Sequence, residues 1–265
     1  MTENKMNNIK AVIFDCDGVM FDTADLNRHY YNQILNHFGY NDMTDQQFSF
    51  VHAHTVDNSI SYLFKDKNVD FEEIESYRQN MDYKYYLKYM KFEENLIKLL
   101  CFLKPDYKTA IATNRSNSMS IVLDEFKLNE YFDIVVTSSD VNNPKPYPDQ
   151  LIKIINFFKL KPEQILYIGD SNVDESASHK ANVNFVAYKN KNLKANYHID
   201  NLIQLITILN SWDVYVVEAV DKVDKVDKVD AVDKVDKVDA VDKVDAVDKV
   251  DKVEAVDKVD IILKF

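Results

Sequence analysis

Short and nearly continuous apolar runs recur along the chain between residues 9 and 209. Such runs are typical of strands covered on both faces, because neither face then needs polar side chains. Segments with apolar residues at helical spacing lie between them, and strands that alternate with helices predict a doubly wound α/β fold with a parallel sheet. The predicted strands are Ile9–Phe14, Thr109–Ala112, Ile134–Val136, Ile165–Ile168 and Phe185–Ala187, and the predicted helices cover about 93–104, 117–128, 148–159, 173–181 and 199–209.

The stretch from about 21 to 90 interrupts this alternation and shows almost no strand pattern. Aromatic and aliphatic side chains recur every four residues from Leu26 to Phe38, which predicts a helix with one apolar face. A second long helix is predicted over Glu72–Tyr89. We interpret the stretch as a helical subdomain inserted after the first strand, with its aromatic stripe packed in a core. The surrounding domain would then comprise residues 1–20 and 91–210.

The C-terminal segment, 211–265, contains a near-perfect three-residue repeat, V-D-K or V-D-A, between Val217 and Asp260. On an α-helix each triplet advances by about 300°, so the valines form no lasting apolar face. We therefore expect a low-complexity tail that is disordered or forms a lone solvated helix. The alternative is a segment that binds a partner.

Charge and cysteine content narrow the class of protein. The repeat holds 15 acidic residues and 9 lysines, so it carries half of the net charge of −12. An acidic chain argues against a general nucleic-acid binder. Two cysteines provide no disulfide framework, and no run of about 18 apolar residues could span a membrane. The N-terminus lacks an apolar signal region, so we expect a cytoplasmic protein with no membrane partner; the sequence leaves its oligomeric state open.

Two acids follow the first predicted strand directly, in Phe14-Asp15-Cys16-Asp17-Gly18. Along an extended chain, Asp15 and Asp17 would lie on one side and Cys16 on the other. Buried aspartates are scarce unless they are paired or bind a metal. An Asp-Gly turn that simply ends the strand is the structural alternative. We interpret Cys16 as a core residue and not as a reactive thiol.

Polar residues also follow other predicted strands. Thr113-Asn114 comes after Ile111-Ala112, and Gly169-Asp170 comes after Ile165–Ile168. Between them, Lys145 lies in the run Pro144-Lys145-Pro146, where the second proline disfavours helical geometry. Ligands bind beyond the carboxyl ends of strands in open α/β sheets, so these residues are candidates for one site.

Four segments, in order, resemble the motifs of the haloacid dehalogenase superfamily. They are Asp15-Cys16-Asp17-Gly18-Val19, Thr113-Asn114, Lys145-Pro146 and Gly169-Asp170 with Asp174. Phe21-Asp22-Thr23 and the helical insertion resemble the subfamily with a helical cap, which includes phosphoglycolate phosphatases and β-phosphoglucomutases. The resemblance covers about residues 9–209 and implies a Rossmann-like core with an inserted cap over 21–90.

The resemblance also implies residue roles. Asp15 would be the nucleophile that forms an aspartyl-phosphate, and Asp17 would protonate the leaving oxygen and then activate water. Thr113 would hydrogen-bond a phosphate oxygen, and Asn114 would help through its backbone N–H. Lys145 would neutralise charge on the phosphoryl group and on the nucleophile.

The metal implied by the resemblance is Mg²⁺, which favours hard oxygen ligands. Asp15, the carbonyl group of Asp17, and Asp170 would hold it. Asp174 would be either a partner of Lys145 or an indirect metal contact.

Two positions depart from the family pattern. Gly169 stands where β-phosphoglucomutases usually have a metal-binding glutamate, which favours a phosphatase. Asn182 stands where glycine is common, although asparagine also tolerates the left-handed conformation at a helix end. Three further residues are weaker candidates for substrate contact: His52, His54 and Arg115.

These observations predict a Mg²⁺-dependent phosphatase that acts on a small phosphorylated metabolite through an aspartyl-phosphate. A β-phosphoglucomutase-like phosphotransferase is the second reading. Dehalogenase activity is disfavoured, because it needs no Mg²⁺ and normally lacks the second acid, Asp17. A non-catalytic protein that presents the repeat tail is the alternative from another class.

Overall fold

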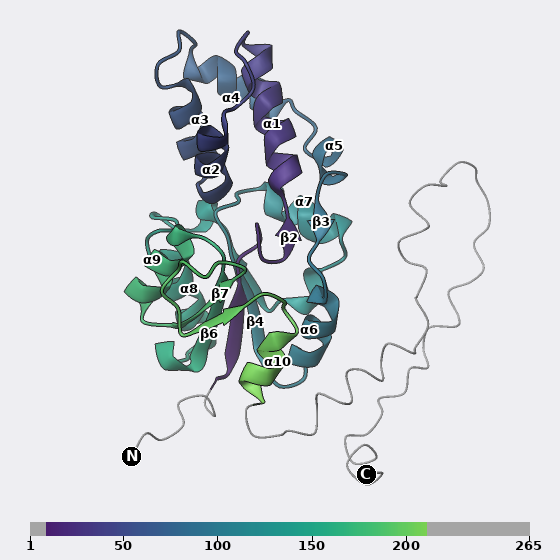
Figure 1. Cartoon of the computed structure of the whole chain (residues 1–265), viewed down its shortest axis with the longest axis vertical. Helices are drawn as coiled ribbons and strands as arrows, with labels where there is room; N and C mark the ends of the chain where they lie inside the picture. Colours follow the sequence, from purple (N-terminus) through teal and green to yellow (C-terminus); the bar gives the residue numbers. More distant parts are fainter. Residues whose placement is uncertain (1–8, 211–265) are drawn as a thin grey trace, which may run out of the picture. The chain divides into compact units, whose positions relative to one another are not determined.

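The computed structural model describes residues 9–210, and its centre is a six-stranded sheet (Figure 1). Neighbouring strands all run parallel, in the order β5-β4-β1-β6-β7-β8. The predicted doubly wound α/β sheet is therefore confirmed. The strands are β1 (Ala11–Phe14), β4 (Lys108–Ala112), β5 (Ile134–Val136), β6 (Ile165–Gly169), β7 (Asn184–Tyr188) and β8 (Tyr197–Ile199).

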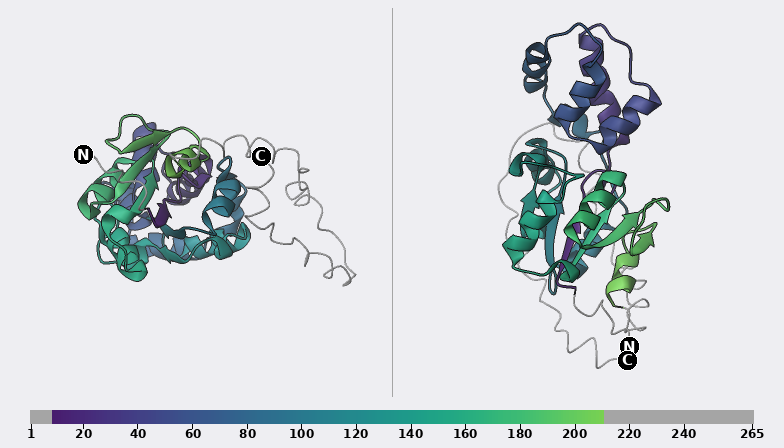
Figure 2. Two further views of the ribbon diagram at one scale, coloured as in Figure 1. Left: turned by 90° about the horizontal axis from the view of Figure 1, so that it is seen from below. Right: turned by 90° about the vertical axis from the view of Figure 1, so that its left-hand side faces the viewer.

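Helices cover both faces of this sheet, and each face has its own apolar core (Figure 2). Alternation along β1 divides its residues: Val12 and Phe14 pack with α6, α7 and α10, whereas Ala11 and Ile13 pack with α8 and α9. The helices are α6 (Leu96–Leu103), α7 (Ser118–Glu125), α8 (Asp149–Phe158), α9 (Asn172–Ala181) and α10 (Gln204–Leu209), with short 3₁₀ turns at Asn129–Tyr131, Ser138–Asp140 and Pro162–Gln164.

The register of the central strands brings their carboxyl ends to one level. Phe14, the last residue of β1, pairs with Ile111 of β4 and with Ile168 of β6. The backbone N–H of Asp15 continues the ladder by donating to the carbonyl oxygen of Ile168 at 2.9 Å. Residues that follow β1, β4 and β6 must therefore meet at the same edge of the sheet.

A helical insertion, defined here as residues 24–87, interrupts the chain after β1. It leaves through β2 and returns through β3, which pair antiparallel, with Phe21 opposite Phe92. Figure 1 places these helices beyond the carboxyl ends of the central strands. The elements are β2 (Phe21–Asp22), α1 (Ala24–His37), α2 (Asp45–Ala53), α3 (Val56–Phe64), α4 (Phe71–Gln79), α5 (Lys84–Leu87) and β3 (Lys91–Phe92).

The single helix predicted over Glu72–Tyr89 is wrong, because α4 ends at Gln79 and α5 begins at Lys84. The side chain of Asn80 donates to the carbonyl oxygen of Ser76, and Asp82 accepts from the backbone N–H of Lys84. Such local side-chain bonds replace helical backbone bonds and end the helix between these positions.

Three short strands were not predicted: β8 and the pair β2–β3. With two or three residues each, they carry too few positions for an alternation to be recognised. The expectations for the repeat tail, 211–265, lie outside the described residues.

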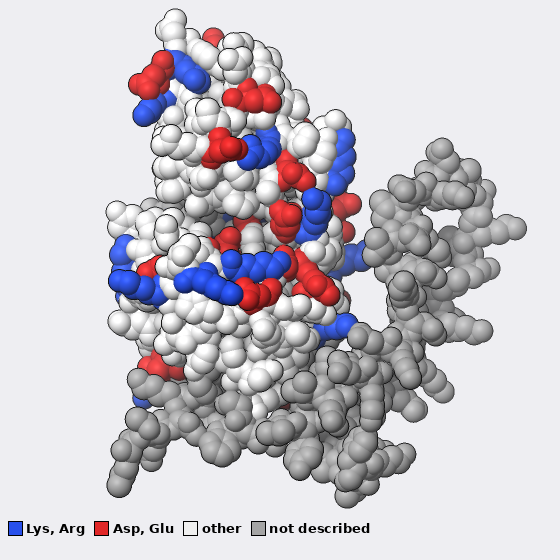
Figure 3. Space-filling view, viewed as in Figure 1, with Lys and Arg blue, Asp and Glu red and all other residues white. Residues whose placement is uncertain are grey.

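Acidic and basic side chains are interspersed on the face shown in Figure 3. Within residues 9–210, every helix is too short or too polar to cross a membrane.

Candidate active site

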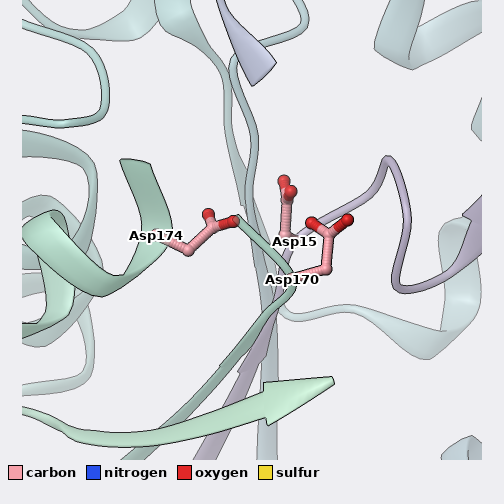
Figure 4. Close-up of side chains that lie close together, drawn as sticks. All are labelled: Asp15, Asp170 and Asp174. Atoms are coloured by element: carbon pink, nitrogen blue, oxygen red, sulfur yellow. The ribbon is translucent and has the colours of Figure 1, made fainter. Parts of the chain in front are cut away.

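Three aspartates from different parts of the chain meet at the carboxyl edge of the sheet (Figure 4). Asp15 follows β1, Asp170 follows β6 and Asp174 lies on α9. Carboxylate oxygens of all three lie within 4.8 Å of one another. Figure 4 shows the carboxylates of Asp15 and Asp170 side by side, with Asp174 reaching toward them from its helix.

Lys145 joins this cluster from the loop before α8. Its ammonium group lies 2.8 Å from Oδ1 of Asp15 and 2.7 Å from Oδ1 of Asp174, and it also donates to the hydroxyl of Tyr167 at 3.0 Å. Burial alone would lower the pKa of Lys145, but the two carboxylates outweigh burial and hold that pKa above its ordinary value. Lys145 is therefore a permanently charged group fixed beside Asp15.

Both oxygens of Asp174 are already occupied. Oδ1 accepts from Lys145 and from the hydroxyl of Tyr167, at 2.7 and 2.5 Å. Oδ2 accepts from the backbone N–H of Ser171 at 3.1 Å and from the hydroxyl of the same residue. This arrangement favours Asp174 as the partner that orients Lys145 over Asp174 as a direct metal ligand.

The carboxylate of Asp170, in contrast, makes no hydrogen bond or ion pair within the described part of the chain. It lies against Gly18, where an added Cβ would come within 2.1 Å of its Oδ2 atom. Gly18 also has a φ of +79°, which side chains rarely adopt. A glycine at position 18 is thus needed so that the first loop can approach Asp170.

Burial raises the pKa of Asp15 to about 7, against the opposing charge of Lys145. Burial and the negative charges of Asp174 and Asp15 also raise the pKa of Asp170 well above its ordinary value. Asp15 is buried and Asp170 is half-buried, and a single lysine, Lys145, lies among these acids and Asp174, so the site is short of positive charge. The oxygen donors of Asp15 and Asp170 therefore fit a hard divalent cation such as Mg²⁺.

Asp17 does not join the aspartate cluster through its side chain, because it forms a bidentate pair with Arg115. Nε of Arg115 donates to Oδ2 at 2.8 Å, and Nη2 donates to Oδ1 at 2.6 Å. Burial would raise the pKa of Asp17, but the charge and hydrogen bonds of Arg115 hold that pKa below its ordinary value. Arg115, a weak candidate in the sequence, thus forms an ion pair with the motif residue Asp17.

The residues after β4 connect the site to α8 and to the insertion. The side-chain amide of Asn114 donates to the carbonyl oxygen of Lys145 at 3.0 Å and approaches that of Ala53 at 3.5 Å. Thr113 is fully buried, and its hydroxyl accepts from the backbone N–H of Arg115. Asn114 lines the cavity described below; Thr113 does not.

A cavity of about 80 Å³ opens over the aspartate cluster, and both the core and the insertion line it. The core contributes Asp15, Asp17, Lys145, Asp170, Asn114 and Arg115. From the insertion, His52 and His54 both face the cavity, so these weaker candidates lie where a substrate could reach them. The insertion also contributes Asn27, Tyr30, Tyr31 and Tyr83.

Two residues that position the site were missed in the sequence. Gln150 bonds two motifs at once, since its amide donates to the carbonyl oxygen of Thr113 at 2.6 Å and accepts from the backbone N–H of Lys145 at 3.1 Å. Tyr167 bonds Lys145 and Asp174. The available signal was a polar glutamine on the face of α8 that carries the apolar residues. Tyr167, in contrast, has the sequence pattern of an ordinary strand residue.

The remaining sequence predictions concern backbone and core. Cys16 is fully buried, and burial raises the pKa of its thiol, so its assignment to the core is confirmed. Asn182 ends α9 in the left-handed conformation with a φ of 56°, as expected for a glycine substitute. An added Cβ at Gly169 would lie 2.4 Å from Cβ of Asp174, so a glutamate does not fit there without rearrangement.

Known protein sequences are similar to most of this chain. A family model for haloacid dehalogenase-like hydrolases matches residues 12–188. The pyrophosphatase PpaX of Bacillus mycoides (strain KBAB4) is 27% identical over 212 residues, which cover 76% of this chain and 97% of that protein.

Solved structures show the same fold. A HAD-superfamily hydrolase of subfamily IA, variant 1, from Geobacter sulfurreducens PCA has a TM-score of 0.64 and 36% identity, covering 77% of this chain and 97% of that one. β-Phosphoglucomutase from Clostridium difficile also has a TM-score of 0.64, with 19% identity and coverage of 80% and 96%, a similarity that concerns the fold alone. The family match spans β1 to β7 and includes every residue of the aspartate cluster; the chain belongs to the haloacid dehalogenase-like hydrolases.

Proposed function

We propose that this chain is a Mg²⁺-dependent phosphatase that hydrolyses a small phosphorylated metabolite through an aspartyl-phosphate intermediate. The observation that carries the proposal is the convergence of Asp15, Lys145 and Asp170 at one edge of the sheet, under one cavity. The pyrophosphatase name of the Bacillus mycoides relative supports a phosphate-releasing reaction.

In the first step, an oxygen of Asp15 attacks phosphorus while the bond from phosphorus to the leaving oxygen breaks. Asp17 supplies the proton to that oxygen. In the second step, water attacks the phosphorus of the aspartyl-phosphate, Asp17 takes a proton from the water, and Asp15 is released with inorganic phosphate. Because Arg115 stabilises ionised Asp17, the proton-donating step requires this ion pair to loosen.

Lys145 offsets negative charge on Asp15 and on the phosphoryl oxygens as they approach each other. Asp174 and Tyr167 hold its ammonium group in place, at 2.7 and 3.0 Å. Asn114 lines the same cavity and would contact a phosphoryl oxygen. The role of Thr113 as a hydrogen-bond donor to phosphate stays a prediction.

Asp15, Asp170 and the backbone carbonyl group of Asp17 would hold the magnesium ion. When bound, the ion would neutralise phosphoryl charge and lower the repulsion between substrate and carboxylates. The carboxylate of Asp170 supports this assignment, since it is free of other hydrogen-bond partners within residues 9–210.

The helical insertion would act as the cap. It supplies one wall of the cavity and contacts the core where Tyr83 meets Arg115 and where Ala53 meets Asn114. A cap in this place would exclude bulk water during phosphoryl transfer and would select the leaving group. Cys16 and Cys101 are both free thiols, in keeping with a cytoplasmic location.

Release of phosphate from p-nitrophenyl phosphate tests the proposal. With Mg²⁺, the wild-type chain should turn over, and Asp15→Asn should lower kcat by about 10³-fold or more, since the nucleophile is removed. Asp45→Asn is the matched control, because the Asp45 side chain is 96% exposed and lies outside the cavity. Equal, slow release by wild type and Asp15→Asn would end the proposal.

A further inference from the structure

The peptide group that follows Asp170 is held on both of its sides. Its carbonyl oxygen, which belongs to Asp170, accepts a hydrogen bond from the side-chain amide of Asn190 at 2.8 Å. Its N–H, which belongs to Ser171, donates to Oδ2 of Asp174 at 3.1 Å. Because a peptide group is planar, these two bonds fix the orientation of the whole group. Asp174 is a motif residue, whereas Asn190 was not a candidate in the sequence.

This peptide group helps to set the direction of the Asp170 carboxylate. The carboxylate itself makes no hydrogen bond within residues 9–210, so its own contacts do not aim it. The peptide group before Asp170 continues β6, whose last residue, Gly169, pairs with Ala187 of β7. The orientations of the two flanking peptide groups determine where the Cα–Cβ bond of a residue points. Asp170 is therefore aimed through its backbone.

The amide of Asn190 is held in one orientation. Its nitrogen donates to the carbonyl oxygen of Asp170, and its oxygen accepts from the backbone N–H of Asn192 at 3.2 Å. Turning the amide over would place oxygen against oxygen and nitrogen against an N–H group, so both bonds would be lost. Asn190 therefore presents an N–H donor to the loop that carries Asp170.

The segment that carries Asn190 is fixed by contacts outside the aspartate cluster. β7 ends at Tyr188, whose hydroxyl donates to Oε1 of Glu93 at 2.6 Å, and Lys189 pairs with the same carboxylate. The backbone N–H of Lys189 also donates to the carbonyl oxygen of Ile199 in β8 at 2.8 Å. Because these contacts hold the segment, Asn190 can constrain the loop after β6 instead of following it.

We propose that Asn190 is a positioning residue for the metal site: it holds the peptide group after Asp170 and so keeps the Asp170 carboxylate aimed at the divalent cation. Asn190 does not line the cavity, so it acts through Asp170. Groups that orient metal ligands in this way typically contribute about 10- to 100-fold to metal affinity. The inference rests on the proposed function, because the cation is the one that the phosphatase reaction would use.

Binding of Mn²⁺ to the metal-free full chain tests the inference without turnover. Mn²⁺ replaces Mg²⁺ because the electron paramagnetic resonance signal of the free ion reports its dissociation constant. Asn190→Ala removes the donor and should raise this constant by about tenfold or more. Asn192→Ala is the matched control, since Asn192 is exposed in the same loop and the substitution keeps the backbone N–H that bonds Asn190. The control should bind Mn²⁺ as the wild-type chain does.

Asn190→Asp isolates the donor from the rest of the side chain. It keeps the size of asparagine and the oxygen that accepts from Asn192, but an ionised carboxylate has no N–H for the carbonyl oxygen of Asp170. Its added negative charge would by itself attract a cation. Weaker Mn²⁺ binding by this variant therefore reports the lost donor, and we expect it. This variant decides the question if unfolding curves show that Asn190→Ala does not fold.

Phosphate release from p-nitrophenyl phosphate over a range of Mg²⁺ concentrations separates positioning from damage to the fold. Positioning predicts that Asn190→Ala needs about tenfold more Mg²⁺ for half-maximal activity. At saturating Mg²⁺ its kcat should approach that of the wild-type chain, because the bound ion then orders Asp170. A lower kcat with an unchanged requirement for Mg²⁺ contradicts a positioning role.

The failure of this inference can be distinguished from the failure of the proposed function. A folded Asn190→Ala chain that binds Mn²⁺ as tightly as the wild-type chain overturns the inference and leaves the proposed function intact. Asp170→Asn should weaken Mn²⁺ binding more than either Asn190 variant, because it replaces a proposed ligand. If the wild-type chain binds no Mn²⁺, or if Asp170→Asn binds it equally well, the proposed metal site is wrong, and the inference is overturned with it.

Discussion

Asp15 and Asp174 contact the same lysine, but their environments shift their pKa values in opposite directions. Asp174 accepts four hydrogen bonds, and with the charge of Lys145 these outweigh burial and hold its pKa below the ordinary value. Asp15 has one ion pair and two acidic neighbours, so burial raises its pKa to about 7. The number of donors around each carboxylate decides the sign.

This contrast predicts how stability depends on pH when a chelator keeps the site free of metal. Between the unfolded pKa of Asp15, 3.8, and its folded pKa of about 7, only the folded chain keeps the proton. Stability should therefore fall as pH rises through this window, by up to about 1.4 kcal/mol per pH unit. The free energy of unfolding is measured with denaturant at several pH values. It should fall with this slope for the wild-type chain and with a smaller slope for Asp15→Asn.

Asp174→Asn provides the opposite control. A carboxylate with a depressed folded pKa stabilises the chain above its unfolded pKa and loses that contribution as pH falls through the folded pKa. The substitution should therefore destabilise the chain at pH 7, by about 3–5 kcal/mol for a broken buried pair. If both variants changed stability in the same direction at pH 7, the opposite signs given to these two carboxylates would be wrong.

At the scale of elements, the junction between β6 and α9 places the acidic cluster. Gly169 ends the strand and Asp174 lies in the first turn of α9, with no space for a side chain between them. We expect Gly169→Ala to destabilise the chain by about 1–3 kcal/mol through overpacking. It should also lower kcat by displacing Asp174 from Lys145.

Gly39→Ala separates this effect from ordinary glycine replacement. Gly39 has a φ of +79°, and an added Cβ would meet nothing within 4 Å. The substitution should cost about 1–2 kcal/mol of backbone strain and leave kcat unchanged. Unfolding curves and phosphate release, measured on both variants, test the distinction; an unchanged kcat for Gly169→Ala would show that the junction does not position the site.

Elements with a strong periodicity were predictable from the sequence, and those governed by tertiary contacts were not. The buried strands β1 and β6 are predicted by their apolar runs, and the acids that follow them indicate the carboxyl edge of the sheet. The break between α4 and α5 depends on local bonds of Asn80 and Asp82, which compete with an equally reasonable helix.

For the site, the family motifs located the residues but not their pairings. Nothing in the spacing of Asp17 and Arg115, which are separated by 98 positions, indicates that they form a bidentate pair. The position of Gln150 on the apolar face of α8 was a signal, but its partners were not predictable, because they are backbone groups of Lys145 and of Thr113, which lies 37 positions away. Such hydrogen-bonded pairs are determined by the tertiary fold, and the local sequence pattern does not predict them.

At the scale of the whole molecule, the described residues include both apolar cores and the candidate active site. Both apolar cores and all cavity-lining residues identified above lie between Ile9 and Ile206. The repeat that begins at Val217 contributes half of the net charge of −12, and removing it halves the overall acidity. Whether the repeat tail contributes to catalysis can therefore be tested by removing it.

We expect a chain shortened to residues 1–212 to keep the wild-type unfolding midpoint and the wild-type kcat/KM with Mg²⁺. A chain shortened to 1–203 is the contrasting control, because it also loses α10, whose Leu205 and Ile206 are buried in the core shared with α6. Loss of two such side chains should destabilise the fold by about 4 kcal/mol or more. If the 1–212 chain lost activity as severely as the 1–203 chain, the site would depend on residues beyond the core that surrounds it, and a catalytic unit confined to the described region would be refuted.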